Sequence, residues 1–205
     1  MEFCRLSSVF SYRSTPRDSH RKTPPVTIRI AQIHDIKGLV EVLTQSFHPP
    51  HGWLSWLQPV LKLGVYEDLR TRLSSSYPYY RCLVALESGE IARENLPSIV
   101  GTVEIALRNG LINESLYISN LAVSHTYRRQ GVARNLLLKC EQIAVEWDHQ
   151  SLSLHVLEDN YPAKKLYLSL GYQLLKTEIS WHNLLFKSPK RLFLQKTLKI
   201  DTQSL

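Results

Sequence analysis

The chain has 205 residues, of which 43% are hydrophobic and 21% charged, and its formal net charge is +7. The length suits one ordinary folded domain with tails, and the composition is that of a globular protein, which excludes an intrinsically disordered chain. No apolar run approaches the ~18 residues that a membrane-spanning helix needs, so the sequence predicts no membrane span.

The positive charge lies at the two ends of the sequence. Residues 1–25 hold five Lys or Arg and two acidic residues (+3), and residues 176–205 hold six and two (+4), whereas residues 26–175 balance fourteen against fourteen. A nucleic-acid-binding domain would carry its excess charge in the folded body. We therefore expect no nucleic-acid partner; the alternative is a weak acidic or membrane-surface partner that binds the basic ends.

Residues 1–25 are rich in Ser and Arg, and two prolines, Pro24 and Pro25, close the segment. This composition predicts a basic, disordered tail. It also resembles an organelle transit peptide, although Glu2 and Asp18 weaken that match. We expect a cytoplasmic location, with the plastid as the alternative.

The cysteine count argues against a disulfide framework and a zinc site. Three cysteines, Cys4, Cys82 and Cys140, are an odd number without C-x-x-C spacing. His48 and His51 have no third ligand nearby, so we expect a loop pair and no metal site. Cys82 and Cys140 lie in apolar patterns and should behave as small buried hydrophobes.

The chain opens with a strand and a helix. The stretch "VTIRIA", residues 26–31, alternates as a strand does, and Asp35 offers an N-cap for an amphipathic helix to about Phe47. Prolines interrupt residues 48–80, where the pattern is helical around 54–75. Trp53 and Trp56 lie in that segment.

The next part of the sequence has the pattern of strands, and helices and strands alternate after it. The segments 82–87, 98–107 and 116–123, separated by turn-forming residues, predict an antiparallel meander. A helix to about Trp147, a strand at 151–156, a helix at 160–170 and strands near 172–180 and 191–198 follow, in the order βαβαβ. The sequence thus predicts an α/β domain with a mixed sheet over residues 26–200.

The loop "RRQGVA", residues 128–133, places a glycine between arginines at the start of a helix. Backbone N–H groups at a helix N-terminus, without a side chain in the way, are what an anion requires. The loop lacks both the Gly-Lys-Ser/Thr of a Walker motif and the G-x-G-x-x-G of a dinucleotide site. The competing interpretation is a turn glycine with solvated arginines.

Two motifs together resemble the GCN5-related N-acetyltransferase (GNAT) family. Arg128-x-x-Gly131-x-Ala133 matches the family's R/Q-x-x-G-x-G/A pyrophosphate loop. Some thirty residues later, "EDNYPAKKLYLSLGY" matches the helix that follows in the family, through Asn160, Ala163, Leu166, Tyr167, Gly171 and Tyr172. The "YISNLAV" and "LHVLEDN" wording is similar to that of the plastid and cyanobacterial branch.

The resemblance implies a GNAT-like acyl-CoA N-acyltransferase fold and acetyl-CoA as the co-substrate. It places the pantetheine arm along the backbone of residues 121–123 and the pyrophosphate at the loop that follows. The residues that it implies for cofactor binding are Leu121, Ala122, Val123, Arg128, Arg129, Gln130, Gly131, Val132, Ala133, Arg134 and Asn160.

The resemblance also suggests the catalytic residues. Tyr167 takes the place of the family's tyrosine near the cofactor sulfur, as the acid for the leaving thiolate; the alternative is a core tyrosine on an apolar helix face. His155, where related enzymes carry a glutamate, is the candidate base, against a purely structural histidine. Glu104 and Glu158 are the fallback bases.

We therefore expect an enzyme that transfers acetyl from acetyl-CoA to a primary amine by direct attack in a ternary complex. The acceptor is a protein N-terminus, a lysine or a small arylalkylamine. The rival is a non-catalytic acyl-CoA-binding sensor or regulatory protein on the same fold. The sequence leaves open whether the protein is a monomer or a homodimer.

Overall fold

The computed structural model describes residues 26–47, 58–75, 77–87, 98–109, 114–178 and 189–198. The expected tail at 1–25, the His48 and His51 pair, and Trp53 and Trp56 lie outside the described residues.

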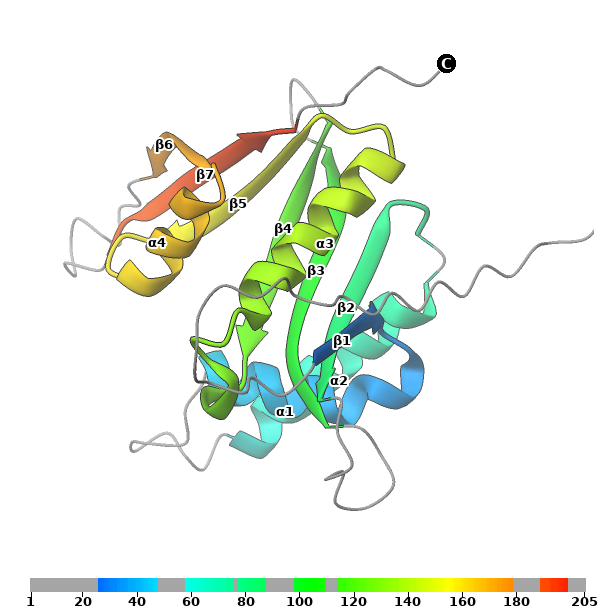
Figure 1. Cartoon of the computed structure of the whole chain (residues 1–205). Coiled ribbons are helices and arrows are strands. Elements are labelled where there is room, and N and C mark those ends of the chain that lie inside the picture. Colours follow the sequence, from blue (N-terminus) through cyan, green and yellow to red (C-terminus); the bar gives the residue numbers. More distant parts are fainter. Residues whose placement is uncertain are drawn as a thin grey trace, which may run out of the picture. The chain divides into compact units, whose positions relative to one another are not determined.

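Seven strands form one sheet in the order β1-β2-β3-β4-β5-β7-β6 (Figure 1). The strands are β1 (Val26–Ile30), β2 (Tyr80–Glu87), β3 (Ile99–Asn109), β4 (Glu114–Val123), β5 (Ser151–Leu157), β6 (Gln173–Glu178) and β7 (Arg191–Thr197). The helices are η1 (Ile33–Asp35), α1 (Ile36–Phe47), α2 (Gln58–Ser74), η3 (His125–Tyr127), α3 (Val132–Glu146) and α4 (Tyr161–Ser169). The predicted α/β class with a mixed sheet is confirmed.

The chain divides into two compact units whose segments alternate along the sequence. The first falls within residues 1–76, 82–102 and 122–133, and the second within 77–81, 103–121 and 134–205. Strands β3 and β4 therefore contribute residues to both units.

In the first unit, β1 pairs antiparallel with β2, from Val26 opposite Glu87 to Ile30 opposite Leu83. Helix α1 buries an apolar stripe formed by Ile36, Leu39, Val40 and Leu43, as the sequence period predicts. A Cβ on Gly38 would lie 2.8 Å from Cδ1 of Ile99. The glycine therefore allows α1 to approach β3 closely.

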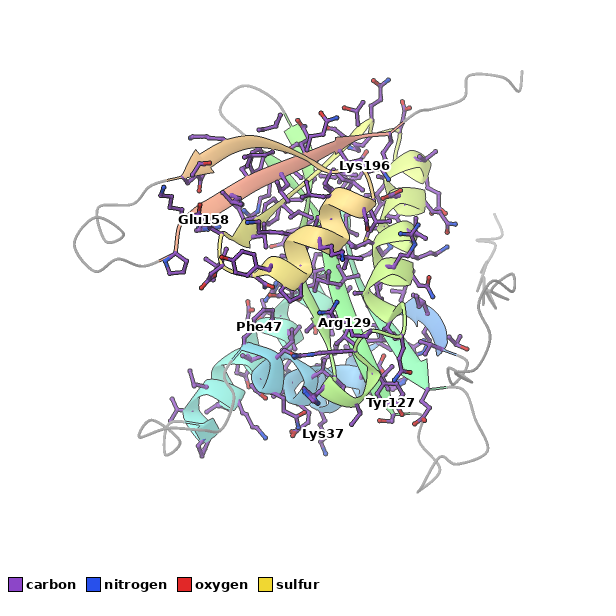
Figure 2. The ribbon with its side chains drawn as sticks, turned by 60° about the vertical axis from the view of Figure 1, so that its left-hand side comes forward. Lys37, Phe47, Tyr127, Arg129, Glu158 and Lys196 are labelled. Carbon is purple, nitrogen blue, oxygen red and sulfur yellow. The ribbon has the colours of Figure 1, made fainter. Side chains whose placement is uncertain are left out.

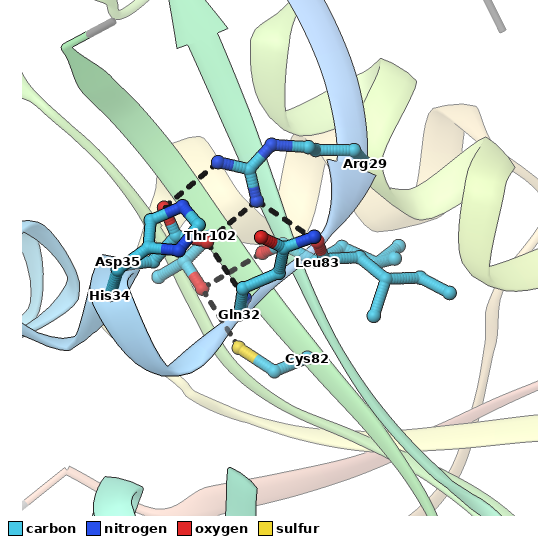
Figure 3. Close-up of polar contacts among 8 residues, drawn as sticks. Arg29, Gln32, His34, Asp35, Cys82, Leu83 and Thr102 are labelled. Atoms are coloured by element: carbon cyan, nitrogen blue, oxygen red, sulfur yellow. Dashed lines mark hydrogen bonds and ion pairs between the residues drawn. The ribbon is translucent and has the colours of Figure 1, made fainter. Parts of the chain in front are cut away.

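Asp35 directly precedes α1, but its carboxylate serves a different purpose from the expected helix cap (Figure 3). It accepts a hydrogen bond from the backbone N–H of Gln32 at 2.7 Å, and two from the Arg29 guanidinium at 2.6 and 2.9 Å. The prediction that Asp35 is the N-cap of the helix was therefore wrong: Asp35 closes the η1 turn and joins it to β1. A buried carboxylate needs such donors, because burial without them is costly.

The second unit contains the β5-β7-β6 end of the sheet. Strand β4 pairs parallel with β5, whereas β7 pairs antiparallel with both β5 and β6. The last strand thus lies between β5 and β6, an order that the βαβαβ rhythm alone did not specify. Buried residues of α3 recur at helical spacing: Leu136, Leu137, Cys140 and Ala144.

Cys82 and Cys140 are buried, as expected of small hydrophobes. In the described part of the chain, no group of His, Cys, Asp or Glu side chains is arranged to hold a metal ion. Among the described helices, none combines the length and apolar character needed to cross a membrane.

The Arg29–Asp35 pair predicts an acid-sensitive contribution to stability. Burial raises the pKa of Asp35, but the hydrogen bonds from Arg29 and Gln32 outweigh it, so the pKa lies below its ordinary value. A depressed carboxyl pKa stabilises the fold above the unfolded-state pKa near ~3.9, and this stabilisation is lost as the pH falls through the folded-state value. We expect Asp35→Asn to lower the free energy of unfolding at pH 7 by about 1 to 3 kcal/mol.

Urea unfolding at pH 7 and pH 3 measures the effect, and the variant should show a smaller loss between the two. Asp68→Asn is the matched control, since Asp68 pairs with Arg72 on α2 and its side chain is 58% exposed. An exposed pair contributes at most ~1 kcal/mol. Equal costs for the two variants would contradict the special role of Asp35.

Candidate active site

The loop between β4 and α3 has the backbone that the sequence motif predicts. Arg129 and Gly131 both adopt left-handed conformations, with φ of 63° and 81°. Helix α3 begins at the next residue, Val132, and runs for 15 residues. Its first N–H groups have no partner within the helix and lie at the positive end of the helix dipole. The loop is therefore suited to an anion.

Two side chains of the motif hold the loop itself in place. The Arg128 Nε donates to the carbonyl of Val123 at 3.1 Å, and the Gln130 Nε2 donates to the carbonyl of Thr126 at 2.8 Å. Arg129 and Arg134 are exposed, as Arg128 is. Because Arg128 and Gln130 are engaged with backbone carbonyls, Arg129 and Arg134 are the freer cations for a bound phosphate.

Tyr127 fastens the same loop to the end of β2. Burial raises the pKa of Tyr127 to about 12, and a hydrogen bond with the Glu87 side chain adds to this effect. Tyr127 and Arg129 both project from the loop (Figure 2). The phenol thus remains protonated at neutral pH and acts as a permanent donor to Glu87.

Strand β4 contains an irregularity just before the residues expected to contact the pantetheine arm. Asn120 has a φ of 52° and donates from Nδ2 to the Glu104 carboxylate at 2.9 Å. A left-handed residue within a strand re-aims the backbone groups that follow it. Ala122 is buried, while Leu121 and Val123 are half-buried. Glu104, a fallback base, is 1% exposed and anchors Asn120.

His155 on β5 is bonded to a residue that the sequence did not single out. The Tyr117 hydroxyl lies 2.8 Å from His155 Nδ1. The Phe193 ring packs against the imidazole, with ring centroids 4.9 Å apart. Strands β4 and β5 bring these side chains together, because Tyr117 is in register with Ser153, two residues before His155.

The sequence did contain a signal for this pair. Residues two apart on a strand share a face, and diagonal neighbours on adjacent strands are within reach of aromatic side chains. A tyrosine and a histidine on neighbouring strands of the sheet therefore indicate such a contact.

The surroundings of His155 favour the neutral imidazole. Burial is the largest cause that lowers its pKa, the positive charges of Arg191 and Arg108 add to it, and the nearby Glu178 carboxylate opposes it. The net result is a pKa below the ordinary value of about 6.5. At neutral pH the ring can accept a proton.

Tyr167 lies on α4 and is 7% exposed, with its ring edge-on to Tyr172 at 5.8 Å. Burial, together with the nearby Tyr117, raises the pKa of Tyr167 to about 12. The phenol is fully protonated at neutral pH and available as a donor. Its burial also satisfies the competing interpretation of a core tyrosine, so the acid role stays a prediction.

Asn160 and Glu158 flank the start of α4. Asn160 is the N-cap of this helix, because its Oδ1 accepts from the backbone N–H of Ala163 at 3.2 Å. Its expected cofactor contact stays a prediction. Glu158 is exposed, and its backbone carbonyl accepts from Lys164 Nζ at 2.9 Å.

Comparison with known families places the chain in a class. The profile of the acetyltransferase (GNAT) family matches residues 42–172, more than half of the sequence. The chain belongs to this family. Its class is therefore that of an acetyl-CoA-dependent N-acetyltransferase, and the family and co-substrate predicted from the sequence are confirmed at this level.

Known proteins that resemble this chain are named as N-acetyltransferases. "GCN5-related N-acetyltransferase 10, chloroplastic" of Arabidopsis thaliana is 28% identical over 172 residues, covering 79% of this chain and 67% of that protein. A putative [ribosomal protein bS18]-alanine N-acetyltransferase of Bacillus subtilis is 27% identical, covering 71% and 80%. The PaiA N-acetyltransferase of Thermoplasma acidophilum, solved with coenzyme A, shares the fold with a TM-score of 0.63 at 16% identity, covering 84% and 98%.

The loop geometry predicts that position 131 controls acetyl-CoA binding. Nothing lies within 4 Å of a Cβ placed on Gly131, but its φ of +81° strains any other residue. A glutamate there would also repel a phosphate. We expect Gly131→Glu to weaken acetyl-CoA binding at least about tenfold, a loss of ~1.4 kcal/mol, in isothermal titration calorimetry.

Gly64→Glu is the matched control. Gly64 lies in α2, also has nothing within 4 Å of a Cβ, and undergoes the same change of charge. It should leave the affinity within about twofold, since it removes a helix-interior glycine and no loop contact. Equal weakening by both variants would show that the loop is not the phosphate site.

Proposed function

We propose that the protein transfers the acetyl group of acetyl-CoA to a primary amine of a protein, the α-amino group at an N-terminus, by direct attack in a ternary complex. One observation carries the proposal: the Tyr117 hydroxyl lies 2.8 Å from Nδ1 of His155, whose pKa is held below its ordinary value. The pair is a proton acceptor that is ready at neutral pH.

Because the pKa of His155 is lowered, it is a weak base, and this favours an α-amine over a lysine side chain as the acceptor. An N-terminal amine has a pKa of roughly 7.7 to 8.0, so an appreciable fraction is already neutral near pH 7.5, whereas a lysine amine near ~10.4 is almost wholly protonated. A histidine with a lowered pKa is poorly matched to deprotonating a lysine ammonium. Lysine and a small arylalkylamine remain the alternative acceptors.

The proposed reaction forms a bond between the amine nitrogen and the acetyl carbon and breaks the bond between that carbon and the CoA sulfur. The amine proton passes to the Tyr117 oxygen as the Tyr117 proton passes to His155 Nδ1. Backbone N–H groups near Val123 would stabilise the oxyanion. Tyr167, whose pKa of about 12 lies above that of a thiol, would donate a hydrogen bond to the leaving thiolate rather than a proton.

We propose that the loop from Arg129 to Arg134 receives the pyrophosphate through its backbone N–H groups and its exposed guanidinium groups. The left-handed residues at 129 and 131 and the start of α3 support this assignment. The backbone of residues 121–123 would bind the pantetheine amides, since the irregularity at Asn120 re-aims it. We further propose residues 26–200 as the catalytic domain.

The location is also a proposal. Relatives from Arabidopsis thaliana carry chloroplastic names, and residues 1–25 have the Ser- and Arg-rich composition of a transit peptide. These observations support the plastid alternative over the cytoplasm.

The proposed function predicts product in an acceptor screen. The protein and acetyl-CoA are incubated with peptides that have free N-termini, peptides whose only amines are lysines, and small aromatic amines, and mass spectrometry identifies the products. We expect acetylation of free N-termini above the level given by Gly131→Glu, which controls for spontaneous acetylation. Intact acetyl-CoA binding without any product would favour the non-catalytic sensor.

The Tyr117–His155 pair predicts the pH dependence. Because His155 must be neutral, kcat/KM should fall as the pH drops through its pKa, below about 6.5, in addition to the ionisation of the acceptor amine near ~8. His155→Ala should remove the lower ionisation and leave the upper one. Tyr117→Phe should reduce kcat on the order of 10²-fold with acetyl-CoA affinity preserved.

Tyr167→Phe provides the contrast in the same assay. It should lower kcat and keep both ionisations, because the Tyr167 phenol does not change protonation in this range. If the lower ionisation persists in His155→Ala, another base or water performs the deprotonation.

A further inference from the structure

Glu178 ends β6, outside the residues 42–172 that the family profile matches. Its carboxylate nevertheless approaches the proposed base: Glu178 Oε2 lies 3.2 Å from His155 Nε2. The two ring nitrogens of His155 thus face different groups, Tyr117 at Nδ1 and Glu178 at Nε2.

The Nε2 atom is buried and has no well-directed hydrogen bond within the described residues. Two exposed cations, Arg191 on β7 and Arg108 on β3, lower the pKa of His155, and Glu178 raises it. Arg108 lies over the Tyr117 ring, 3.6 Å from its centroid. The Glu178 carboxylate thus opposes the effect of the two positive charges on the His155 pKa. It does so through its negative charge at short range and not through a well-directed hydrogen bond.

We propose that Glu178 is a positioning residue that keeps the His155 proton on Nε2 and stabilises the imidazolium formed during acetyl transfer. A carboxylate beside one ring nitrogen fixes the tautomer, because the protonated nitrogen is attracted to the negative charge. Nδ1 is then left as the acceptor for the Tyr117 hydroxyl. This inference rests on the proposed function for the catalytic step, whereas the tautomer is a property of the resting protein.

The proton balance requires no further reactant. The amine proton ends on His155 Nδ1 by way of Tyr117, the imidazole becomes positive, and Glu178 remains ionised beside it. The Glu178 side chain is 38% exposed and that of His155 15% exposed. The carboxylate can therefore stay hydrated at one edge, which lowers the cost of keeping its charge next to the buried ring.

A competing account treats Glu178 as an ordinary surface partner of Arg191. The two residues are opposite each other in the β6–β7 register, and exposed pairs contribute little to stability. In that account Glu178 would not influence the His155 tautomer or its ionisation. The two accounts therefore differ in a measurement on His155 itself.

The test uses Glu178→Gln in the full chain, with ¹⁵N-labelled histidine followed by NMR from pH 5 to 8. In the unaltered protein we expect the His155 signals of the Nε2–H tautomer. In Glu178→Gln we expect a mixture of tautomers and an ionisation at lower pH. The lower ionisation in the kcat/KM profile should shift in the same direction, and kcat should fall on the order of tenfold, as is typical for a supporting partner of a functional histidine.

Arg191→Gln is the matched partner variant, since it removes the opposing charge at the facing position on β7. It should shift the His155 ionisation to higher pH, the opposite direction from Glu178→Gln. Because it leaves Glu178 in place, it also tests the electrostatic account if Glu178→Gln proves unstable in thermal unfolding.

The outcomes separate this inference from the proposed function. A shifted tautomer and opposite displacements of the ionisation, without acetylated product, would support the role of Glu178 in orienting His155 and reject the proposed reaction. Product formation with an unchanged tautomer and pH profile in Glu178→Gln would overturn the role of Glu178. An unmoved ionisation in Arg191→Gln would likewise overturn it.

Discussion

The parallel pairing of β4 and β5 is the constraint from which the site follows. Parallel neighbours cannot be joined by a tight turn, so the chain must cross over through a helix, which here is α3. The crossover runs from the end of β4 at Val123 to the start of α3 at Val132, and the glycine-containing loop lies between them. The same pairing brings Tyr117 of β4 beside His155 of β5. One topological requirement thus generates both the candidate anion loop and the candidate base.

Three polar contacts illustrate how burial can serve different ends. Asp35 is saturated by three donors from Arg29 and Gln32, which makes it part of the scaffold. Glu104 receives the Asn120 amide and fixes an unusual backbone. His155 is different, because its partners act in opposite directions on its charge. A group held in such a balance can gain a proton without breaking the fold, as a catalytic base must.

Much of the fold was predictable, because the hydrophobic periods of helices and strands depend only on neighbouring residues in the sequence. The core stripe of α1, the strands of the front half and the loop before α3 all appear at the expected positions. The position of β7 between β5 and β6 was not predictable, since periodicity does not encode strand order. Tyr117 and Glu178 were missed for a related reason: each contacts His155 across strands, 38 residues away in one case. Asp35 was predicted as a helix cap, but it is an ion-pair partner, because Arg29 on β1 lies beside its carboxylate.

The left-handed Asn120 limits which sequences can maintain this strand. Only residues with small or locally bonding side chains adopt a φ of 52° at low cost, chiefly Gly, Asn and Asp. Glycine would relieve the backbone but leave the Glu104 carboxylate without its amide donor, and aspartate would place a second negative charge beside it. Asparagine alone among the three satisfies both demands. We therefore expect position 120 to tolerate only asparagine, although this residue is neither an acid, a base nor a nucleophile.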